Sequence, residues 1–485
     1  MFAQHTLAVL RANGMLATVM PHGVLFRGGA EKEIRKGLIE DDVLEAVIGL
    51  PPNLFYGAGI PACILVMRSR GAKPAERRGK VLFINADAEY FAGRAQNYRR
   101  PEHVEKIASA FAAFRDIPGY AAVVPVAELA ANDWNLNIRR YADNAPPPEP
   151  QDVRAHLLGG VPKAEVAAKQ DLLAAHGLNP LDLLVERDAA YFDFAPPIAE
   201  RRQISAAIAA NAGVEAQEAR LRDAFATWWQ AREGRLLGLP VTKDLSAVRA
   251  ELLESFAAAL TPIGLLDRFK VSGVIAIWWN ESQYDLKTLV EQGFAGLVDG
   301  WVSTVLTALE NTDSGNGERF DPTSHKVVAR LLPGYLEELA ASEATRSDLE
   351  SRLDATTKKG GEEDDTEDVE ENEETLSAEE VKALKRDLAA AKKEGQRLKS
   401  ELARRLEQAR AELDEGDCQR LVLDIGRSDL SGHLDRHVVA RRVQVVAAFE
   451  NWWDKYRVTL RDIEAEREGT VTSVNRILGG LGYAN

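Results

Sequence analysis

Four short apolar runs within the first 85 positions constrain the fold more than any other feature of this sequence. They are Met15 to Pro21, Val43 to Leu50, Ala62 to Met67 and Lys80 to Asn85. Each run has the length of a strand, and continuous apolar character is typical of strands that are buried on both faces. The sequence therefore predicts a sheet in the first part of the chain.

Helical patterns accompany these runs. Phe2 to Asn13 reads as a helix that stops at Asn13-Gly14, and Glu31 to Glu40 places its apolar residues on one helical face. The order strand, helix, strand predicts an α/β domain over residues 1–145, with a parallel sheet and crossover helices. About four strands are fewer than a doubly wound domain normally uses, so we expect this sheet to be incomplete.

Beyond the breaker Ala145 to Pro150, residues 146–350 are predicted to form a helical domain in which Val271 to Trp279 is the exceptional strand signal. Tryptophans occur as adjacent pairs, which we interpret as anchors of helix packing, with base stacking as the alternative. The pairs are Trp228-Trp229, Trp278-Trp279 and Trp452-Trp453.

Residues 351–376 are predicted to be an acidic disordered linker. Ten acidic residues and no basic residue lie between Glu362 and Glu374, so apolar groups that could offset the entropy of ordering are lacking. The run acts as a solvated spacer in this interpretation, and DNA mimicry is the alternative.

Residues 377–415 are predicted to form a long helix or coiled-coil arm, and residues 416–485 a C-terminal helical segment. The helix can either pair with another chain or pack on its own domain. Its apolar seam consists of Val381, Leu384, Leu388, Ala391, Gly395, Leu398 and Leu402, and then slips to Leu406 and Leu413.

Composition excludes several classes of protein. No apolar run reaches the length of a membrane span, and the first residues lack the pattern of a signal peptide, so we expect a cytoplasmic protein without membrane association. Two cysteines, Cys63 and Cys418, cannot form a disulfide framework or a cysteine-rich zinc site. Residues 1–145 hold 18 basic against 15 acidic side chains, which permits contact with nucleic acid.

Common catalytic and metal-binding motifs are missing. The sequence contains no Walker A motif, no dinucleotide-binding glycine motif, no His-Glu-x-x-His and no Cys-x-x-Cys. His433 and His437 can share a helix face, but without a third ligand we predict surface or capping roles and no metal site. Gly28-Gly29 can form either an anion-binding nest or a tight strand-to-helix turn.

The loop from Pro51 to Pro61 is the most informative segment. Rich in proline, glycine and aromatic residues, it joins two buried strands and so stands at a sheet end, where ligands bind. Phe55 and Tyr56 can present flat faces of the kind that hold a DNA base taken out of its stack. The alternative is that Phe55 closes the sheet end as part of the core.

Five ordered stretches resemble the M (modification) subunits of type I restriction–modification systems, which are S-adenosylmethionine-dependent DNA adenine-N6 methyltransferases. The stretches are Leu16–Glu40, Ala46–Met67, Gly79–Ala86, Ala95–Ile107 and Ala130–Tyr141. The helices that follow and the tail Ile477 to Tyr483 resemble the same subunits more loosely.

The resemblance implies the C-terminal half of a class I methyltransferase sheet with a Rossmann-like arrangement. Met15 to Pro21 would be the fifth strand, Val43 to Leu50 the sixth, and Ala62 to Met67 the seventh, inserted antiparallel. The family's cofactor loop, of the type Asp-Pro-Ala-Cys-Gly-Ser-Gly-Gly, and its Asn-Pro-Pro-Tyr/Phe motif occur nowhere in the 485 residues. The chain is therefore expected to be N-terminally incomplete, to lack catalytic residues and to be inactive alone, although the family implies S-adenosylmethionine as cofactor.

Site residues follow from the matching positions. Phe55 matches the aromatic residue of the family that stacks on adenine. The base-pocket loop would be shaped by Asn53, Tyr56, Gly59 and Pro61, and a pocket wall after the fifth strand would be formed by Pro21, His22, Gly23 and Phe26. Arg27 and Arg94 would contact phosphate, with ordinary surface roles as the alternative. Asn132, Asn135 and Asn137 also match the family, without an assigned mechanism.

The resemblance also implies partners. They are DNA, the specificity (S) subunit, and in addition the restriction (R) subunit or a separately encoded N-terminal methyltransferase half. The alternative function is a non-catalytic assembly or DNA-holding subunit that docks on the specificity subunit.

Overall fold

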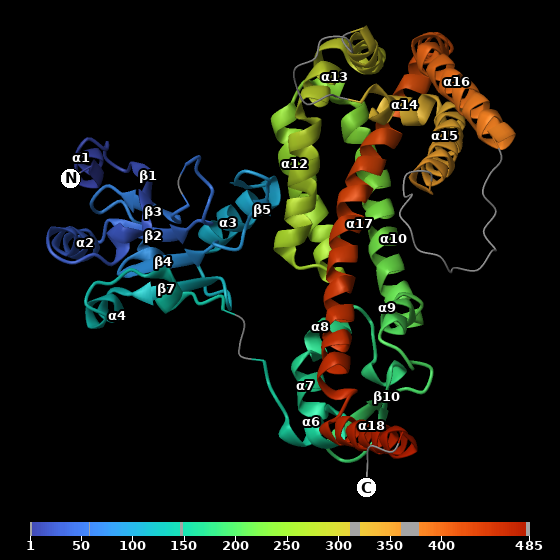
Figure 1. The fold of residues 1–485 in the computed structure, drawn as a ribbon. Coiled ribbons are helices and arrows are strands. Elements are labelled where there is room, and N and C mark those ends of the chain that lie inside the picture. The colour runs from blue at the N-terminus through green and yellow to red at the C-terminus, as the bar shows by residue number, and fades with distance from the viewer. Residues whose placement is uncertain (1, 58, 146–148, 311–320, 360–377, 482–485) are drawn as a thin grey trace. The chain divides into compact units, whose positions relative to one another are not determined.

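A computed structural model describes residues 2–57, 59–145, 149–310, 321–359 and 378–481 (Figure 1). The chain divides into two compact units built from non-contiguous stretches. The first comprises Met1–Ala231, Arg249–Glu281 and Leu430–Asn485, and the second Arg232–Val248 and Ser282–Asp429. The division into five consecutive segments drawn from the sequence remains a prediction.

A five-stranded sheet organises residues 2–145. Its order is β1 (Met15–Pro21), β3 (Ala62–Arg68), β2 (Leu44–Gly49), β4 (Lys80–Asn85) and β7 (Ala121–Pro125), as Figure 1 shows. The four apolar runs of the sequence are the first four of these strands, whereas β7 was not predicted. The helices of this region are α1 (Phe2–Ala8), α2 (Ala30–Glu40), α3 (Pro101–Ala113), α4 (Val126–Ala131) and α5 (Ile138–Tyr141).

The expectation of a parallel sheet was wrong for most strand pairs. Only β2 and β4 pair in parallel, while β3 runs antiparallel to both β1 and β2, and β7 runs antiparallel to β4. The reason is that no helix lies between β2 and β3, so the chain turns back through the loop of residues 50–61 instead of crossing over. The first helix is also shorter than predicted, since α1 ends at Ala8.

Both faces of the sheet are covered at β2, β3 and β4, which explains the continuous apolar runs of these strands. The prediction that Met15 to Pro21 is buried on both faces was wrong, because β1 is an edge strand in which Met15 and Val19 are each 51% exposed. Val47, Leu65 and Phe83 face a core that includes Ile39 of α2. Ala46, Ile48 and Val66 face a second core, which includes Ile107 of α3. Alternate residues of each strand thus enter opposite cores, as the pleat requires.

A buried ion triad links β2 to the segment that follows β3. The Glu45 side chain is completely buried, and it accepts hydrogen bonds from Arg68 Nε at 2.6 Å and Arg77 Nη1 at 2.9 Å. Arg77 also lies over the Phe114 ring at 4.6 Å. Two guanidinium groups therefore neutralise a carboxylate that has no access to water.

The remainder of the first unit is mainly helical, with a small sheet of order β8 (Val161–Pro162), β10 (Tyr191–Phe194) and β9 (Leu184–Glu186) that was not predicted. Residues 155–214 share one core with Val445, Phe449, Trp452 and Tyr456 of α17. The helices that lie wholly or partly in this part of the first unit include α6 (Val153–Leu158), α7 (Lys163–Ala168), α8 (Gln170–Ala175), α9 (Arg202–Ala209), α10 (Ala212–Leu237), α12 (Leu245–Leu260, from Arg249 onward), α13 (Arg268–Glu310) and α18 (Leu460–Gly480).

The strand predicted at Val271 to Trp279 was wrong, because these residues belong to α13. Val271, Val274, Ile275 and Trp278 are all buried, so this part of the helix is apolar around its circumference and imitates a buried strand in sequence. The prediction that the tryptophan pairs anchor helix packing was confirmed. Trp228 lies edge-on to Phe256 with ring centroids 4.9 Å apart, and Trp452 packs edge-on against Phe449 at 5.0 Å.

The second unit holds a pair of antiparallel helices, α15 (Pro333–Lys359) and α16 (Ala378–Ala411). The apolar seam of α16 faces α15, with Leu398, Leu402 and Leu406 buried. Ion pairs between Arg405 and Glu338 and between Lys399 and Glu343 fix the register. The helix expected at 377–415 thus packs against a helix of its own chain.

The prediction of a disordered linker was wrong for residues 351–359, because α15 continues through Lys359; residues 360–376 lie outside the described residues. The other helices are α11 (Leu239–Thr242), α14 (Lys326–Leu331) and α17 (Glu415–Tyr456). None of the helices within the described ranges combines the length and apolar character that a membrane span requires.

We predict that Glu45→Gln will destabilise the sheet by about 3 kcal/mol, because the substitution removes the buried charge that pairs with two partly buried guanidinium groups. Hydrogen exchange of the β2 and β3 amides, followed by mass spectrometry, measures this locally. Glu40→Gln is the matched control, since the half-exposed Glu40 pairs with Lys36 only at 3.8 Å. Equal protection in the two variants would contradict the importance of the triad.

Candidate functional site

The carboxyl ends of β1, β2 and β4 lie at the same edge of the sheet. β2 and β4 are parallel, and β1 has the direction of β2 because β3 runs antiparallel to both. The segments that follow these three strands are residues 22–29, 50–61 and 86–100. In open α/β sheets this edge is where ligands bind.

The loop after β2 presents aromatic side chains to solvent. Its base is closed by a hydrogen bond from Leu50 N to Ala62 O at 2.9 Å. Leu54 packs against the core, whereas Phe55 is 42% exposed and Tyr56 is 94% exposed. The alternative in which Phe55 closes the core is therefore not what the structure shows; Leu54 occupies that position.

A short hairpin after β4 holds this loop. The hairpin consists of β5 (Phe91–Ala92) and β6 (Asn97–Tyr98). The backbone N–H of Asn97 donates to Asn53 O at 2.8 Å, and the Asn97 side-chain amide donates to Pro52 O at 2.8 Å. Asn53 has a φ of 54°, a left-handed conformation that asparagine tolerates better than most residues. The first half of the base-pocket loop is thus fixed by a residue 45 positions away.

Arginines and aromatic rings share the hairpin. Phe91 and Tyr98 are each nearly half exposed, and the guanidinium of Arg100 lies 3.6 Å from the centroid of the Phe91 ring. Arg94 is exposed at the turn, while burial lowers the pKa of Arg99. Exposed rings beside cationic groups are the chemistry that binds unstacked bases and their phosphates.

The segment after β1 forms a one-turn helix, His22–Leu25, and then the turn into α2. His22 N donates to Pro61 O at 3.4 Å, which joins this segment to the far end of the base-pocket loop. Burial lowers the pKa of His22, so its ring is neutral near pH 7, and its Nε2 is buried without a hydrogen-bond partner among the described residues. Phe26 is half exposed.

Several predicted residues have local structural roles instead. Arg27 pairs with Glu31 at 3.7 Å, and Gly29, with a φ of 64°, precedes the first residue of α2. The Gly28-Gly29 pair therefore makes the tight turn. Among the matched asparagines, Asn137 accepts from Arg139 N at the start of α5, Asn135 accepts from Asn137 N at 2.9 Å, and Asn132 accepts from Arg140 at 2.8 Å.

The two spaced histidines, His433 and His437, lie on α17. His433 Nε2 is 2.8 Å from Glu281, and burial lowers the pKa of His437 to about 4. Among the described residues, no group of three or more histidine, cysteine, aspartate or glutamate side chains is placed to hold a metal ion.

Sequence reasoning missed the polar network at the end of β4. Asp87 accepts from Arg139 Nη2 at 2.8 Å and also from the Asn144 side chain, and its backbone N–H donates to Asn85 Oδ1. The buried Asn85 amide donates to Ala142 O at 2.9 Å. The sequence signal for this network was the occurrence of the polar residues Asn85 and Asp87 at the end of a buried strand. The network ties the end of β4 to residues 139–144 and places one hydrogen bond on each carboxylate oxygen of Asp87.

We predict that Asn97→Ala will loosen the loop after β2, because the hydrogen bond from the Asn97 side chain to Pro52 O is lost while the backbone bond from Asn97 N to Asn53 O remains. The loss of about 1 kcal/mol should accelerate amide exchange at residues 53–57 by roughly fivefold. Gln96→Ala is the control, since Gln96 adjoins Asn97 but donates no side-chain bond to the loop. Unchanged exchange in the Asn97 variant would show that the hairpin does not hold the loop.

Comparison with known proteins links this edge to a family. The sequence pattern of the N-6 DNA Methylase family matches residues 1–149. The chain is 44% identical over 138 residues to the type I restriction enzyme MjaVIII methylase subunit of Methanocaldococcus jannaschii. The matched residues make up 28% of this chain and 23% of that protein. It is 33% identical over 170 residues to the HindI methylase subunit of Haemophilus influenzae, covering 33% of this chain and 35% of that protein.

Among solved structures, the chain is similar to the type I restriction–modification system methyltransferase subunit from Streptococcus thermophilus. The sequences are 42% identical over 27% of each chain, with a TM-score of 0.25. The chain spans about a quarter of the length of the first curated relatives that it matches.

Proposed function

We propose that the chain is a modification-subunit component that holds the target adenine during N6 methylation of DNA, because residues 1–149 match the N-6 DNA Methylase family and are similar to the methylase subunit of a type I restriction enzyme. The observation that carries this proposal is the edge described above, where the exposed Phe55 and the arginine-bearing hairpin stand together. Enzymes that modify a base must first extrude it from the stack and hold it against apolar surface.

The strand order supports the proposal. The family resemblance predicts that the seventh strand, Ala62 to Met67, is inserted antiparallel. β3, which contains this run, lies antiparallel to both β1 and β2, in agreement with the predicted direction.

The residues at this edge do not fit S-adenosylmethionine. A nucleoside cofactor needs a glycine-containing loop after a strand and an acidic side chain for its ribose. Asp87, the acid at the end of β4, is already engaged by Arg139 and Asn144. We therefore propose that this edge holds the target base and does not itself bind the methyl donor.

The described residues supply positioning. In this proposal Phe55 stacks on the extruded adenine, while Asn53, Tyr56, Gly59 and Pro61 shape the loop around it. Pro21, His22, Gly23 and Phe26 line the neighbouring wall. Arg94 contacts phosphate, and Arg27 does so only at the expense of its weak pair with Glu31. Orientation of the reacting groups accounts for a large share of catalysis in such transfers.

We predict that Phe55→Ala will weaken binding of a single-stranded oligonucleotide containing adenine by about tenfold, because stacking on an aromatic ring is worth roughly 1–3 kcal/mol per base. Fluorescence anisotropy with the full chain measures the affinity. Tyr284→Ala, which removes an exposed aromatic ring from α13 outside the matched region, is the control. Equal affinities in the Phe55 variant and the unmodified chain would remove Phe55 from the base-binding role.

A second candidate function, assembly on the specificity subunit, is favoured by α18. Leu460, Ile463, Val471, Val474 and Ile477 lie on one face of this helix, and each is about half exposed. An amphipathic helix with an uncovered apolar face is suited to docking against a partner. In this case the chain would hold DNA or the assembly without taking part in the chemistry.

We predict that Val474→Asp will abolish co-elution of the chain with a cognate specificity subunit in size-exclusion chromatography, because a carboxylate would be placed in the apolar contact. Thr472→Asp lies on the opposite face of α18 and should leave co-elution unchanged. If the unmodified chain does not co-elute, the assembly function is excluded, whatever the outcome of the oligonucleotide experiment.

A further inference from the structure

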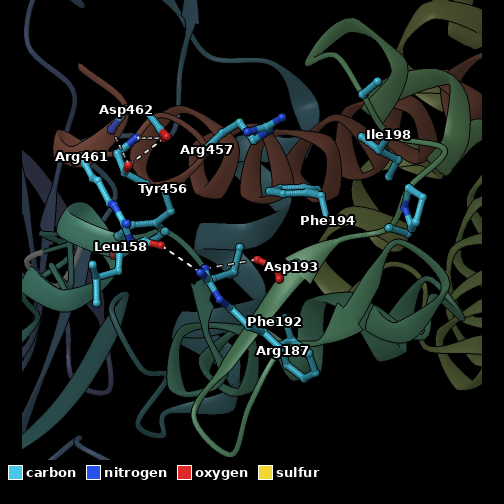
Figure 2. A pocket seen from close by; sticks show the side chains of 17 residues that line it. Leu158, Arg187, Phe192, Asp193, Phe194, Ile198, Tyr456, Arg457, Arg461 and Asp462 are labelled. Atoms are coloured by element: carbon cyan, nitrogen blue, oxygen red, sulfur yellow. Dashed lines mark hydrogen bonds and ion pairs between the residues drawn. The ribbon is translucent and has the colours of Figure 1, made fainter. Parts of the chain in front are cut away.

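A pocket of about 610 Å³ lies in the first unit, and none of the residues that line it belongs to residues 2–145 (Figure 2). Three segments line it: residues 158–161, residues 187–199 between β9 and α9, and residues 456–462 between α17 and α18. All three adjoin the core that α17 shares with residues 155–214. The volume is within the range of small-molecule sites in proteins.

One arginine of the pocket is held in a fixed position. Arg187 Nη2 donates to Leu158 O at 3.0 Å. Gly159 and Gly160 have φ values of 78° and 99°, and a Cβ atom at either position would approach Arg187 Nη1 to 3.2 or 3.1 Å. The two glycines therefore provide the space in which this guanidinium sits. Its pairing with Asp193 is weak, at 3.4 Å, so donor capacity remains for a ligand.

Two further arginines carry charge that the described residues do not neutralise by contact. Arg457 lies over the Trp453 ring at 5.4 Å, and Arg461 is in the first turn of α18. Neither forms an ion pair with another described residue. The Asp462 carboxylate accepts hydrogen bonds from Thr459 N at 3.0 Å and Thr459 Oγ1 at 2.6 Å. These hydrogen bonds, together with the charges of the two arginines, lower the pKa of Asp462. Three guanidinium groups thus line one cavity, and its two carboxylates compensate them only in part.

Aromatic rings form another part of the lining. Phe192 and Phe194 both border the pocket, as Figure 2 shows. Phe194 is held by Trp453, whose ring meets it edge-on with centroids 4.9 Å apart. A ring supported in this way offers a firm surface for stacking of a flat group.

We propose that this pocket binds a nucleoside phosphate, with Arg187, Arg457 and Arg461 on the phosphate and Phe194 against the base. Guanidinium groups match phosphate oxygens in geometry and charge, and aromatic rings accept any base. The same chemistry is offered by a free nucleotide and by the phosphorylated end of a nucleic-acid strand. The site is separate from the proposed adenine-holding edge and does not depend on it.

Isothermal titration calorimetry of the full chain tests the proposal with adenosine 5′-monophosphate, adenosine, inorganic phosphate and a 5′-phosphorylated single-stranded oligonucleotide. The monophosphate should bind at least tenfold more tightly than adenosine or phosphate alone. Arg461→Gln should weaken this binding by at least tenfold, and Phe194→Leu should reduce it to the level of inorganic phosphate. Arg467→Gln, an exposed arginine of α18 that does not line the pocket, should change nothing.

The outcomes separate the two sources of the ligand. Binding of the monophosphate identifies a free-nucleotide site, while binding of the oligonucleotide alone, with the same sensitivity to Arg461→Gln, identifies a strand-end site. Binding that is unaffected by Arg461→Gln, or the absence of binding of both the monophosphate and the oligonucleotide, overturns the proposal. Circular dichroism and thermal melting establish that each variant is folded, which is expected for Arg461→Gln because Arg461 is exposed.

Discussion

The placement of β3 between β1 and β2 is the constraint on which the first part of the chain depends. This strand is hydrogen-bonded along both edges and mostly buried on both faces. Its Ile64 pairs with Val19 of β1 on one side and with Ile48 of β2 on the other, and this register determines where each neighbouring strand ends. Because β3 reverses direction, β1 and β2 point the same way, and the segments that follow them meet at one edge with the segment after β4. The buried Glu45, between Arg68 and Arg77, fastens the other end of the same strands. The candidate site is therefore a consequence of strand direction and does not require any single loop to be rigid by itself.

β2, β3 and β4 were predictable because burial on both faces produces a continuous apolar run, and β1 was predictable because its sequence is apolar although Met15 and Val19 are half exposed. Lys80 to Asn85 and Met15 to Pro21 coincide with β4 and β1 in both bounds. Direction was not predictable in this way, since an apolar run carries no information on whether its neighbour is parallel. The segment Val271 to Trp279 failed for a related reason: a helix that is buried all round and a strand that is buried on both faces have the same pattern over nine residues. The strands β8, β9 and β10 are too short to produce a periodic signal.

The candidate site shows a similar division. The composition of the loop after β2 predicts that this loop faces a ligand, and Phe55 and Tyr56 are exposed in it. The partners that hold the loop could not be found by pattern, because Asn97 lies 45 positions from Pro52 and looks like an ordinary turn residue. The same holds for Asp87, whose role depends on residues that follow β7. Arg187 could not be foreseen either, since the two glycines that make room for it are far from it in sequence.

The core shared by residues 155–214 and the end of α17 has a consequence for biosynthesis. Val445, Phe449, Trp452 and Tyr456 leave the ribosome long after Leu173 and Ile204, against which they pack. At ordinary rates of translation the delay is on the order of 10 to 50 s. During that interval the emerging polypeptide exposes apolar surface with no completed partner, which makes this stretch a natural client of chaperones. Maturation of this core must therefore await the translation of residues 445–456.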